Sequence, residues 1–254
     1  NAAIARLQQA VAERPLDALV IFGDDQAELF HDDLRPALAI LWGDTVEGMP
    51  NLYADSPRPV WQAAAWAYGN KGQLYPVASE LGLHLVESAI DAGFEPAHSN
   101  GLPKGKGIGH AFGFIVGRIL NGRSLPIVPV IINTLYPPNQ PLPDRCYQLG
   151  EVVRAAIEAW PKDMRIGIVG SGGLSHFVID QDLDHRFLEA IRTHDVKTLR
   201  SLPKEKLNSG TSELRSWLAA TAALEHLQME LIDYVPCYRT PAGTGMGMTF
   251  AIWK

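Results

Sequence analysis

The feature that most constrains the fold is an apolar run that stops abruptly in a cluster of small residues. Ile166 to Val169 are mostly apolar, and Gly170 to Gly173 follow directly, ahead of Ser175 and His176. A short, β-rich run bounded by glycine is typical of a buried strand. Glycines let the backbone turn sharply and approach another group closely. Because open α/β sheets place ligands beyond the carboxyl ends of their strands, His176 is a candidate site residue.

Three interpretations of this glycine-rich loop remain open. The run Gly170-Ser-Gly-Gly-Leu-Ser175 is close to a dinucleotide-binding fingerprint, but that fingerprint needs a second strand ending in an acid about 20 residues further on. Residues 180–189 look instead like an acidic turn entering a helix. A serine hydrolase would need the G-x-S-x-G elbow, which is absent. The simplest interpretation is a tight strand-to-helix turn with a hydrogen-bonded histidine.

Composition and charge argue against several classes of protein. Of the 254 residues, 46% are hydrophobic and 20% are charged, which is usual for a soluble globular protein with a substantial core. The net charge of -6 argues against a broad nucleic-acid surface. Two cysteines, Cys146 and Cys237, leave no disulfide framework and no multi-cysteine metal site. Because no apolar run approaches the ~20 residues of a membrane span, we expect a cytoplasmic protein without membrane or nucleic-acid partners.

Apolar runs and amphipathic segments alternate along the chain, which favours an α/β fold. Strands are predicted at 16–22, 36–42, 127–132 and 166–169, with a closing strand at the end of 234–253. Helices are predicted at 77–92, 144–160, 184–193 and 211–224. We therefore predict one domain over residues 1–254, a central mixed sheet flanked by helices. Residues 43–76 and 95–109 are predicted to be long loops, and the helical pattern that begins at Asn1 without a cap indicates a missing N-terminal segment.

Glu213 is a candidate metal ligand or catalytic residue. An acid in the first turn of a helix is favoured by the helix dipole, which by itself accounts for most such residues. Here Glu213 and Trp217 are four residues apart and share a face, so that face is at least partly buried. A buried carboxylate needs a cation, a metal or several hydrogen-bond donors.

Two histidines, His110 and His176, stand in glycine-rich loops after apolar segments. The sequence Gly101-Leu-Pro-Lys-Gly-Lys-Gly-Ile-Gly-His110 lacks the order of a phosphate-binding P-loop and fits a flexible loop that presents a histidine. Two histidines with one carboxylate and no useful cysteine indicate oxygen and nitrogen ligands. The 2-His-1-carboxylate arrangement of non-haem iron is one such case.

Six segments, in order along nearly the whole chain, then point to one enzyme family. They are Gly23-Asp-Asp-Gln-Ala-Glu-Leu-Phe30, Gly107-Ile-Gly-His110, Pro129-Val-Ile-Ile-Asn-Thr-Leu-Tyr-Pro137, Arg145-Cys-Tyr-Gln-Leu-Gly150, Gly170-Ser-Gly-Gly-Leu-Ser-His176 and Ser212-Glu-Leu-Arg-Ser-Trp217. With them the sequence resembles the class III extradiol ring-cleavage dioxygenases, the catalytic-subunit family of protocatechuate 4,5-dioxygenase. The closing segment 238–247 is most similar to gallate- and 3-O-methylgallate-cleaving relatives.

The resemblance implies a role for each matching residue. His176 matches the acid/base histidine that takes a proton from the bound catechol and later returns one, for which an ordinary pKa near 6.5 is suited. His110 matches a histidine that stabilises negative charge on bound oxygen, and Glu213 matches the carboxylate ligand of Fe(II). The implied reaction is extradiol cleavage of a catecholic aromatic acid by O2.

Two departures from the family pattern concern the metal ligands. The family's first histidine ligand lies in a Ser-His-x-Pro-like segment, which this chain lacks, so we expect that ligand before Asn1. The position of the second histidine ligand is Gln26, whose amide oxygen binds Fe(II) more weakly than imidazole. Gln26, a water that it holds, or His31 would fill that position, or iron binds in another way.

The segment that closes the chain is a candidate substrate-binding region. Arg239 and Thr244 stand beside a glycine-rich turn, and an aromatic carboxylate taken out of water needs a cation or several donors. Lys104 and Lys106, which flank the His110 loop, are alternative cations or simply solvated charges. The resemblance implies catabolism of lignin-derived aromatics by a homo-oligomer, a dimer. The alternatives are a metal-dependent hydrolase or lyase on the same scaffold, and a nucleotide-binding protein that uses the Gly170 loop.

Overall fold

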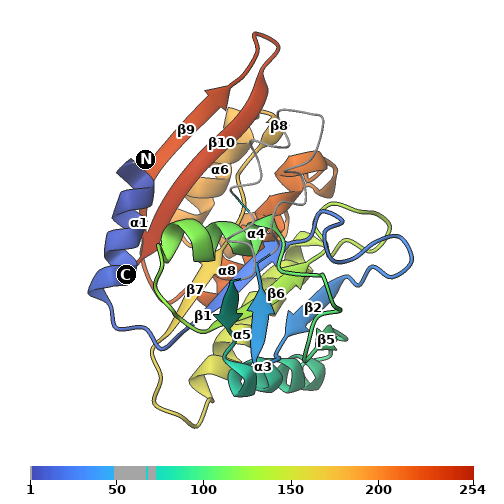
Figure 1. The fold of residues 1–254 in the computed structure, drawn as a ribbon. Coiled ribbons are helices and arrows are strands. Elements are labelled where there is room, and N and C mark those ends of the chain that lie inside the picture. The colour runs from blue at the N-terminus through green and yellow to red at the C-terminus, as the bar shows by residue number, and fades with distance from the viewer. Residues whose placement is uncertain (1, 49–66, 68–72) are drawn as a thin grey trace.

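The computed structural model describes residues 2–48, 67 and 73–254, and its centre is a five-stranded sheet (Figure 1). The strand order is β5-β2-β6-β1-β7. The bounds are β1 Ala18–Asp24, β2 Leu38–Leu41, β5 Ala97–Ser99, β6 Ile127–Ile132 and β7 Ile166–Gly170. β1 runs parallel to β6 and β7, whereas β2 runs antiparallel to β6 and carries β5 in parallel. The predicted α/β fold with a central mixed sheet is confirmed.

The central strands are buried on both faces, as their continuous apolar sequences predict. Every residue of β1 and of β6 is buried. Successive side chains of a strand point to opposite faces, so Val20 and Phe22 enter one hydrophobic core while Leu19 and Ile21 enter another. The sheet therefore separates two cores.

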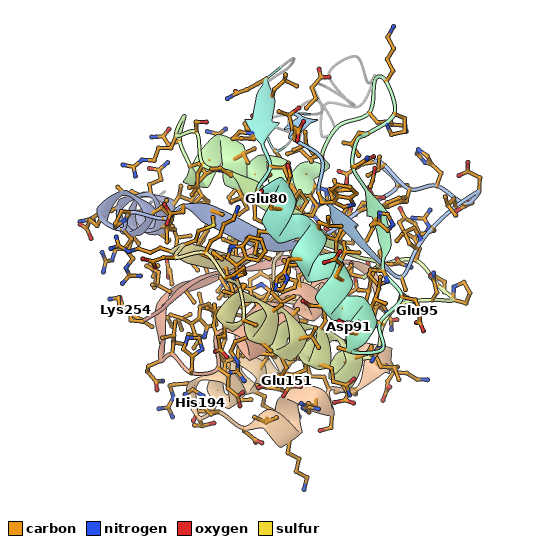
Figure 2. The ribbon with its side chains drawn as sticks, turned by 90° about the horizontal axis from the view of Figure 1, so that it is seen from below. Glu80, Asp91, Glu95, Glu151, His194 and Lys254 are labelled. Atoms are coloured by element: carbon orange, nitrogen blue, oxygen red, sulfur yellow. The ribbon has the colours of Figure 1, made fainter. Side chains whose placement is uncertain are left out.

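Helices cover both faces of the central sheet. One face carries α3 Ser79–Asp91, α5 Pro143–Glu158 and α8 Leu214–Ala223, with α6 Gln181–Arg192 and α7 Val196–Arg200 in the same core. The other face carries α1 Ala2–Glu13, α4 His110–Phe114 and the π-helical turn η2 Ile115–Ile119. Figure 2 shows α3, labelled at Glu80 and Asp91, next to α5, which carries Glu151. Gly150 brings α5 close to α8, because a Cβ there would lie 2.1 Å from the carbonyl oxygen of Ala219.

A second sheet, separate from the first, has the order β8-β10-β9. Its antiparallel strands are β8 His176–Val178, β9 Met229–Tyr238 and β10 Thr244–Trp253, and the β9–β10 hairpin projects at the top of Figure 1. The closing strand predicted for the chain's end is therefore present as β10. It pairs with β9, which the sequence analysis did not predict, and it does not join the central sheet.

The two predicted long loops differ in outcome. Of residues 43–76, positions 49–66 and 68–72 lie outside the described residues, and the described ends form the short pair β3 Thr45–Glu47 and β4 Leu74–Pro76. Within the second predicted loop, 95–109, Ala97–Ser99 forms the edge strand β5 of the central sheet. β5 forms because its backbone pairs with that of β2. The three-residue Ala-His-Ser segment has no apolar pattern from which a strand could be predicted. Across the described ranges, no helix has the length and apolar content needed to cross a membrane.

Candidate active site

The acidic segment after β1 supplies one side of the site. β1 ends at Asp24, which is 1% exposed, at the carboxyl edge of the parallel strands. Asp25 turns the chain there, since its carboxylate accepts from the backbone N–H groups of Leu29 and Phe30 at 2.7 and 3.1 Å. After this turn, Glu28, also 1% exposed, lies next to His110. Asp25 is therefore structural, whereas Asp24 and Glu28 point inward.

Glu213 approaches from the other side, at the junction of the 3-10 turn η4 Ser209–Glu213 with α8. It is 5% exposed, so the predicted burial of its face is confirmed. Its Oε2 accepts from the backbone N–H of Gly173 at 2.7 Å. Trp217, one turn further on, donates from Nε1 to the carbonyl oxygen of Gly172 at 2.9 Å. These two hydrogen bonds therefore connect the start of α8 to the glycine-rich loop after β7.

His176 is the buried histidine of the site, with 2% of its surface exposed. Its Nδ1 lies 2.7 Å from the carbonyl oxygen of Leu174, and its Nε2 lies 3.1 Å from Oε1 of Glu213. Gly210 permits this placement, because a Cβ there would lie 1.9 Å from the imidazole. Burial alone would lower the pKa of His176, but the hydrogen bond and charge of Glu213 raise it above its usual 6.5. Glu213 thus favours the protonated form of the imidazole.

His110 begins α4 and is oriented by Glu28. Its backbone N–H and its Nδ1 lie 3.0 and 2.7 Å from Oε1 of Glu28. Gly109 makes room, since a Cβ there would meet the Glu28 carboxylate at 2.1 Å. Nε2 is turned toward Asp24, 3.6 Å from its Oδ1. Burial would lower the pKa of His110, but the charge and hydrogen bond of Glu28 raise it to about 10.

Gln26 connects the two sides of the site. Its Nε2 lies 3.2 Å from Oδ2 of Asp24 and 3.2 Å from Oε1 of Glu213. Burial, and then the nearby charge of Glu213, raise the pKa of Asp24 to about 7. Among the described residues, one group of acids and histidines is compact enough to hold a metal ion. Its ligand atoms, on Asp24, His110 and Glu213, lie within 4.8 Å of one another.

The structure thus brings together four residues singled out in the sequence, Gln26, His110, His176 and Glu213. His31 is exposed, and its imidazole Nε2 lies 2.9 Å from Nζ of Lys106. Sequence reasoning did not single out Asp24 and Glu28 individually. The sequence feature that could have identified them is their spacing from Gln26, because the alternate positions 24, 26 and 28 carry the polar groups that face the site.

Arg239 and Thr244 lie apart from this cluster, at the end of the β9–β10 hairpin. The Arg239 N–H donates to the carbonyl oxygen of Thr244 at 2.7 Å, and the Thr244 hydroxyl lies 2.7 Å from that of Thr240. Arg239 is exposed and lines a surface hollow of about 470 Å³. Two positions along β10 from Thr244, Met246 pairs with His176.

The glycine-rich loop after β7 is not built to hold a nucleotide. The N–H of Gly173 is already directed at Glu213, and a Cβ on Gly172 would lie 2.8 Å from the Cβ of Glu213. The region where a dinucleotide fold needs a second strand with an acid is instead α6. Both observations argue against the nucleotide-binding alternative.

Comparison with known proteins agrees with this geometry. Residues 2–249 match the family described as the catalytic LigB subunit of aromatic ring-opening dioxygenase. The chain belongs to this family. The resemblance to class III extradiol dioxygenases is confirmed, and membership of the LigB family gives no support to the hydrolase or lyase alternative.

Two relatives illustrate the range of the LigB family. The 2,3-dihydroxyphenylpropionate/2,3-dihydroxicinnamic acid 1,2-dioxygenase of Comamonas testosteroni is 28% identical over 174 residues, which are 68% of this chain and 47% of that protein. The gallate dioxygenase of Pseudomonas putida is 32% identical over 115 residues, which are 43% of this chain and 32% of that protein. The matched regions therefore span about half or less of the length of these relatives.

Proposed function

We propose that the chain catalyses extradiol cleavage of a catecholic aromatic acid by O2 at a non-haem Fe(II) site. Membership of the LigB family supports this proposal. The observation that carries it is the contact between His176 Nε2 and Glu213 Oε1, 3.1 Å apart, inside a cluster that also contains His110 and Asp24. A proton-transfer group and a candidate metal ligand are thus adjacent in one buried site.

The donor set suits a divalent metal ion. Carboxylate oxygens and an imidazole nitrogen are ligands that iron(II) and manganese(II) accept. When bound, Fe(II) supplies the one-electron chemistry that lets dioxygen react with an aromatic ring. The family pattern assigns Glu213 and the Gln26 position to the ion, and both face the cluster.

His176 is proposed as the acid/base. A carbonyl oxygen only accepts, so the contact with Leu174 indicates that Nδ1 carries a hydrogen. Nε2 is then the nitrogen at which a proton is taken from the catechol hydroxyl and later returned. The contact with Glu213 orients Nε2 toward the cluster. His110 is proposed to stabilise negative charge, because its pKa of about 10 keeps the imidazole cationic near neutral pH.

The substrate class is proposed to be an aromatic carboxylic acid of the protocatechuate, gallate or 3-O-methylgallate type. Arg239 and Thr244 are the proposed carboxylate-binding residues. In support, Arg239 lines a surface hollow, and Thr244 lies two positions along β10 from Met246, which pairs with His176. The gallate dioxygenase of Pseudomonas putida is among the relatives. We further propose that the protein acts in the cytoplasm as a homodimer on lignin-derived aromatics, and size-exclusion chromatography with light scattering tests the dimer.

Oxygen uptake with a panel of substrates tests this function. After anaerobic loading with Fe(II), the chain is mixed with catechol, protocatechuate, gallate or 3-O-methylgallate, and O2 consumption and the spectrum of the ring-opened product are recorded. We expect a yellow product from the acids. We also expect a kcat/KM higher than that for catechol by roughly 10⁴-fold, because polar groups built to hold a carboxylate are left unpaired by catechol.

Two results would contradict this proposal. Catechol turned over as well as the acids would show that no carboxylate-binding site exists. Absence of O2 uptake with every catechol, in protein that contains iron, would exclude ring cleavage.

A further inference from the structure

The carboxylate of Asp24 is buried in the site without a full set of partners. Its Oδ2 lies 3.2 Å from Gln26 Nε2 and 3.4 Å from the hydroxyl of Thr134. Its Oδ1 is buried and forms no hydrogen bond with any described residue. Oδ1 lies 3.6 Å from Nε2 of His110, at ion-pair distance. Leaving a buried carboxylate oxygen in this state costs free energy unless a cation compensates it.

Gln26 is oriented as a donor to carboxylates. Its Nε2 contacts both Asp24 and Glu213, 3.2 Å from each. Turning the amide around would place its oxygen against two carboxylate oxygens, which is repulsive. An amide N–H group offers no lone pair to a metal ion. In this arrangement Gln26 therefore holds the two acids at a fixed separation and is not itself a ligand.

His110 is oriented in the manner of a metal-ligating histidine. Oε1 of Glu28 lies 2.7 Å from Nδ1 of His110, and this contact orients the ring so that Nε2 faces Asp24. A carboxylate bound to one imidazole nitrogen commonly orients the other nitrogen toward a metal ion. Asp24, Glu28 and Glu213 are all buried, and no lysine or arginine in the described parts of the chain forms an ion pair with them.

We propose that Asp24, Glu213 and Nε2 of His110 are the ligands of a divalent cation, Mn²⁺ or Fe²⁺, and that Gln26 positions the two carboxylates. This inference rests on the metal-dependent function proposed above and gives that function a different ligand set. Among the described residues, this set consists of two carboxylates and one imidazole. Asp24 thereby supplies a negative charge, which the neutral Gln26 lacks. His110 becomes a ligand and no longer a separate group that stabilises charge on oxygen.

Binding of Mn²⁺ to the metal-free chain tests the ligand set. Isothermal titration calorimetry on the wild-type chain should give one Mn²⁺ per chain. Asp24→Asn keeps the shape of the side chain and removes its charge, so it should weaken Mn²⁺ binding by at least ~100-fold, because loss of even an outer-shell partner costs 10–100-fold. Gln26→Ala should weaken binding by roughly 10-fold, as expected for a positioning residue.

Asp25→Asn is the matched control, since Asp25 is a neighbouring buried acid whose two oxygens accept backbone hydrogen bonds and which is not part of the cluster. Its Mn²⁺ affinity should stay within ~3-fold of wild type, well short of the 10–100-fold loss of a metal-site partner. Circular dichroism of each metal-free variant shows whether it folds. Should Asp24→Asn not fold, nitrogen hyperfine couplings of Mn²⁺ in the wild-type chain replace it. They should show one coordinated imidazole.

Several outcomes would overturn the inference. These are Mn²⁺ binding by Asp24→Asn as tight as by wild type, equal weakening in Asp24→Asn and Asp25→Asn, two coordinated imidazoles, or no Mn²⁺ binding by the folded wild type. A failure of the proposed reaction can be distinguished from a failure of the ligand set. If Mn²⁺ binds through Asp24 but Fe(II)-loaded protein consumes no O2 with any catechol, the ligand set stands and ring cleavage does not.

Discussion

At the scale of single residues, His176 is the group on which the proposed chemistry depends most directly. His176→Gln keeps a side-chain N–H that can reach Glu213 but removes the titratable nitrogen. We expect kcat for O2 uptake to fall by roughly 10²–10⁴-fold, the usual contribution of a general acid/base. Metal content and melting temperature should be unchanged. His185→Gln, at an exposed position of α6, is the control. Near-wild-type turnover in His176→Gln would remove this residue from the mechanism.

The pair of Glu28 and His110 predicts a pH dependence of stability. In the metal-free folded protein the pKa of His110 is raised to about 10, above its ordinary value of 6.5, mainly by Glu28 acting against burial. A raised histidine pKa stabilises the fold fully below pH 6.5, and this stabilisation is lost as the pH rises through 10. Glu28→Gln should therefore lower the free energy of unfolding more at pH 6 than at pH 10. Urea denaturation in EDTA measures this, and an equal loss at both pH values would contradict it.

At the scale of elements, the contact between α5 and α8 sets where Glu213 enters the site. Both helices lie in the same core, and Gly150 leaves no room for a side chain against Ala219 and Ala222. Because α8 begins directly after Glu213, a helix that is pushed outward displaces this carboxylate as well. A glycine in the middle of α5 is thus explained by packing and not by helix propensity.

Gly150→Ala tests this contact. The added Cβ would lie 2.1 Å from the Ala219 carbonyl oxygen and 2.7 Å from the Ala222 Cβ. Overpacking of this kind costs about 1–3 kcal/mol, more than the ≈ 1 kcal/mol by which alanine is the better helix former. We expect a net loss of stability in urea denaturation. Gly101→Ala is the control, since nothing lies within 4 Å of a Cβ there and its φ is not positive. Equal stability of Gly150→Ala and wild type would contradict the packing argument.

At the scale of the whole molecule, the cluster joins segments that are far apart in the chain. Asp24 follows β1, His110 opens α4, and Glu213 precedes α8. An ion bound by all three residues binds the folded chain and not the unfolded one, so it should stabilise the entire fold. Metal binding is therefore expected to raise the free energy of global unfolding.

Thermal denaturation with and without Mn²⁺ measures this effect. At a concentration ~100-fold above Kd, the gain in the free energy of unfolding should be about 2.7 kcal/mol. For a chain of this size that gain raises Tm by roughly 5–10 °C, and EDTA should reverse the shift. Asp24→Asn should show a much smaller shift at the same Mn²⁺ concentration. An unchanged wild-type Tm in saturating Mn²⁺ would contradict metal binding across these segments.

The sequence by itself determined the elements whose signal is local. Continuous apolar runs mark β1 and β6, because strands buried on both faces need apolar side chains throughout. The apolar run of β7 also marks a strand, but its residues are half-buried and not buried as the sequence predicts. Helical spacing of apolar residues marks α3, α5 and α8. The burial of Glu213 followed from its position four residues before Trp217. The family resemblance, carried by short motifs, then identified His110, His176, Glu213 and the Gln26 position as residues of one site.

The tertiary structure decided what depends on partners distant in sequence. β5 is a strand because the backbone of β2 pairs with it, and β9 is a strand because β10 does. Gln26 and Glu213 meet although 187 residues separate them. No local pattern indicates that Asp24 would be left with an oxygen lacking a hydrogen bond, or that Glu28 would direct His110 toward it. Hydrophobic periodicity records which face of an element is buried, whereas the charges that meet at a site are set by how the elements pack.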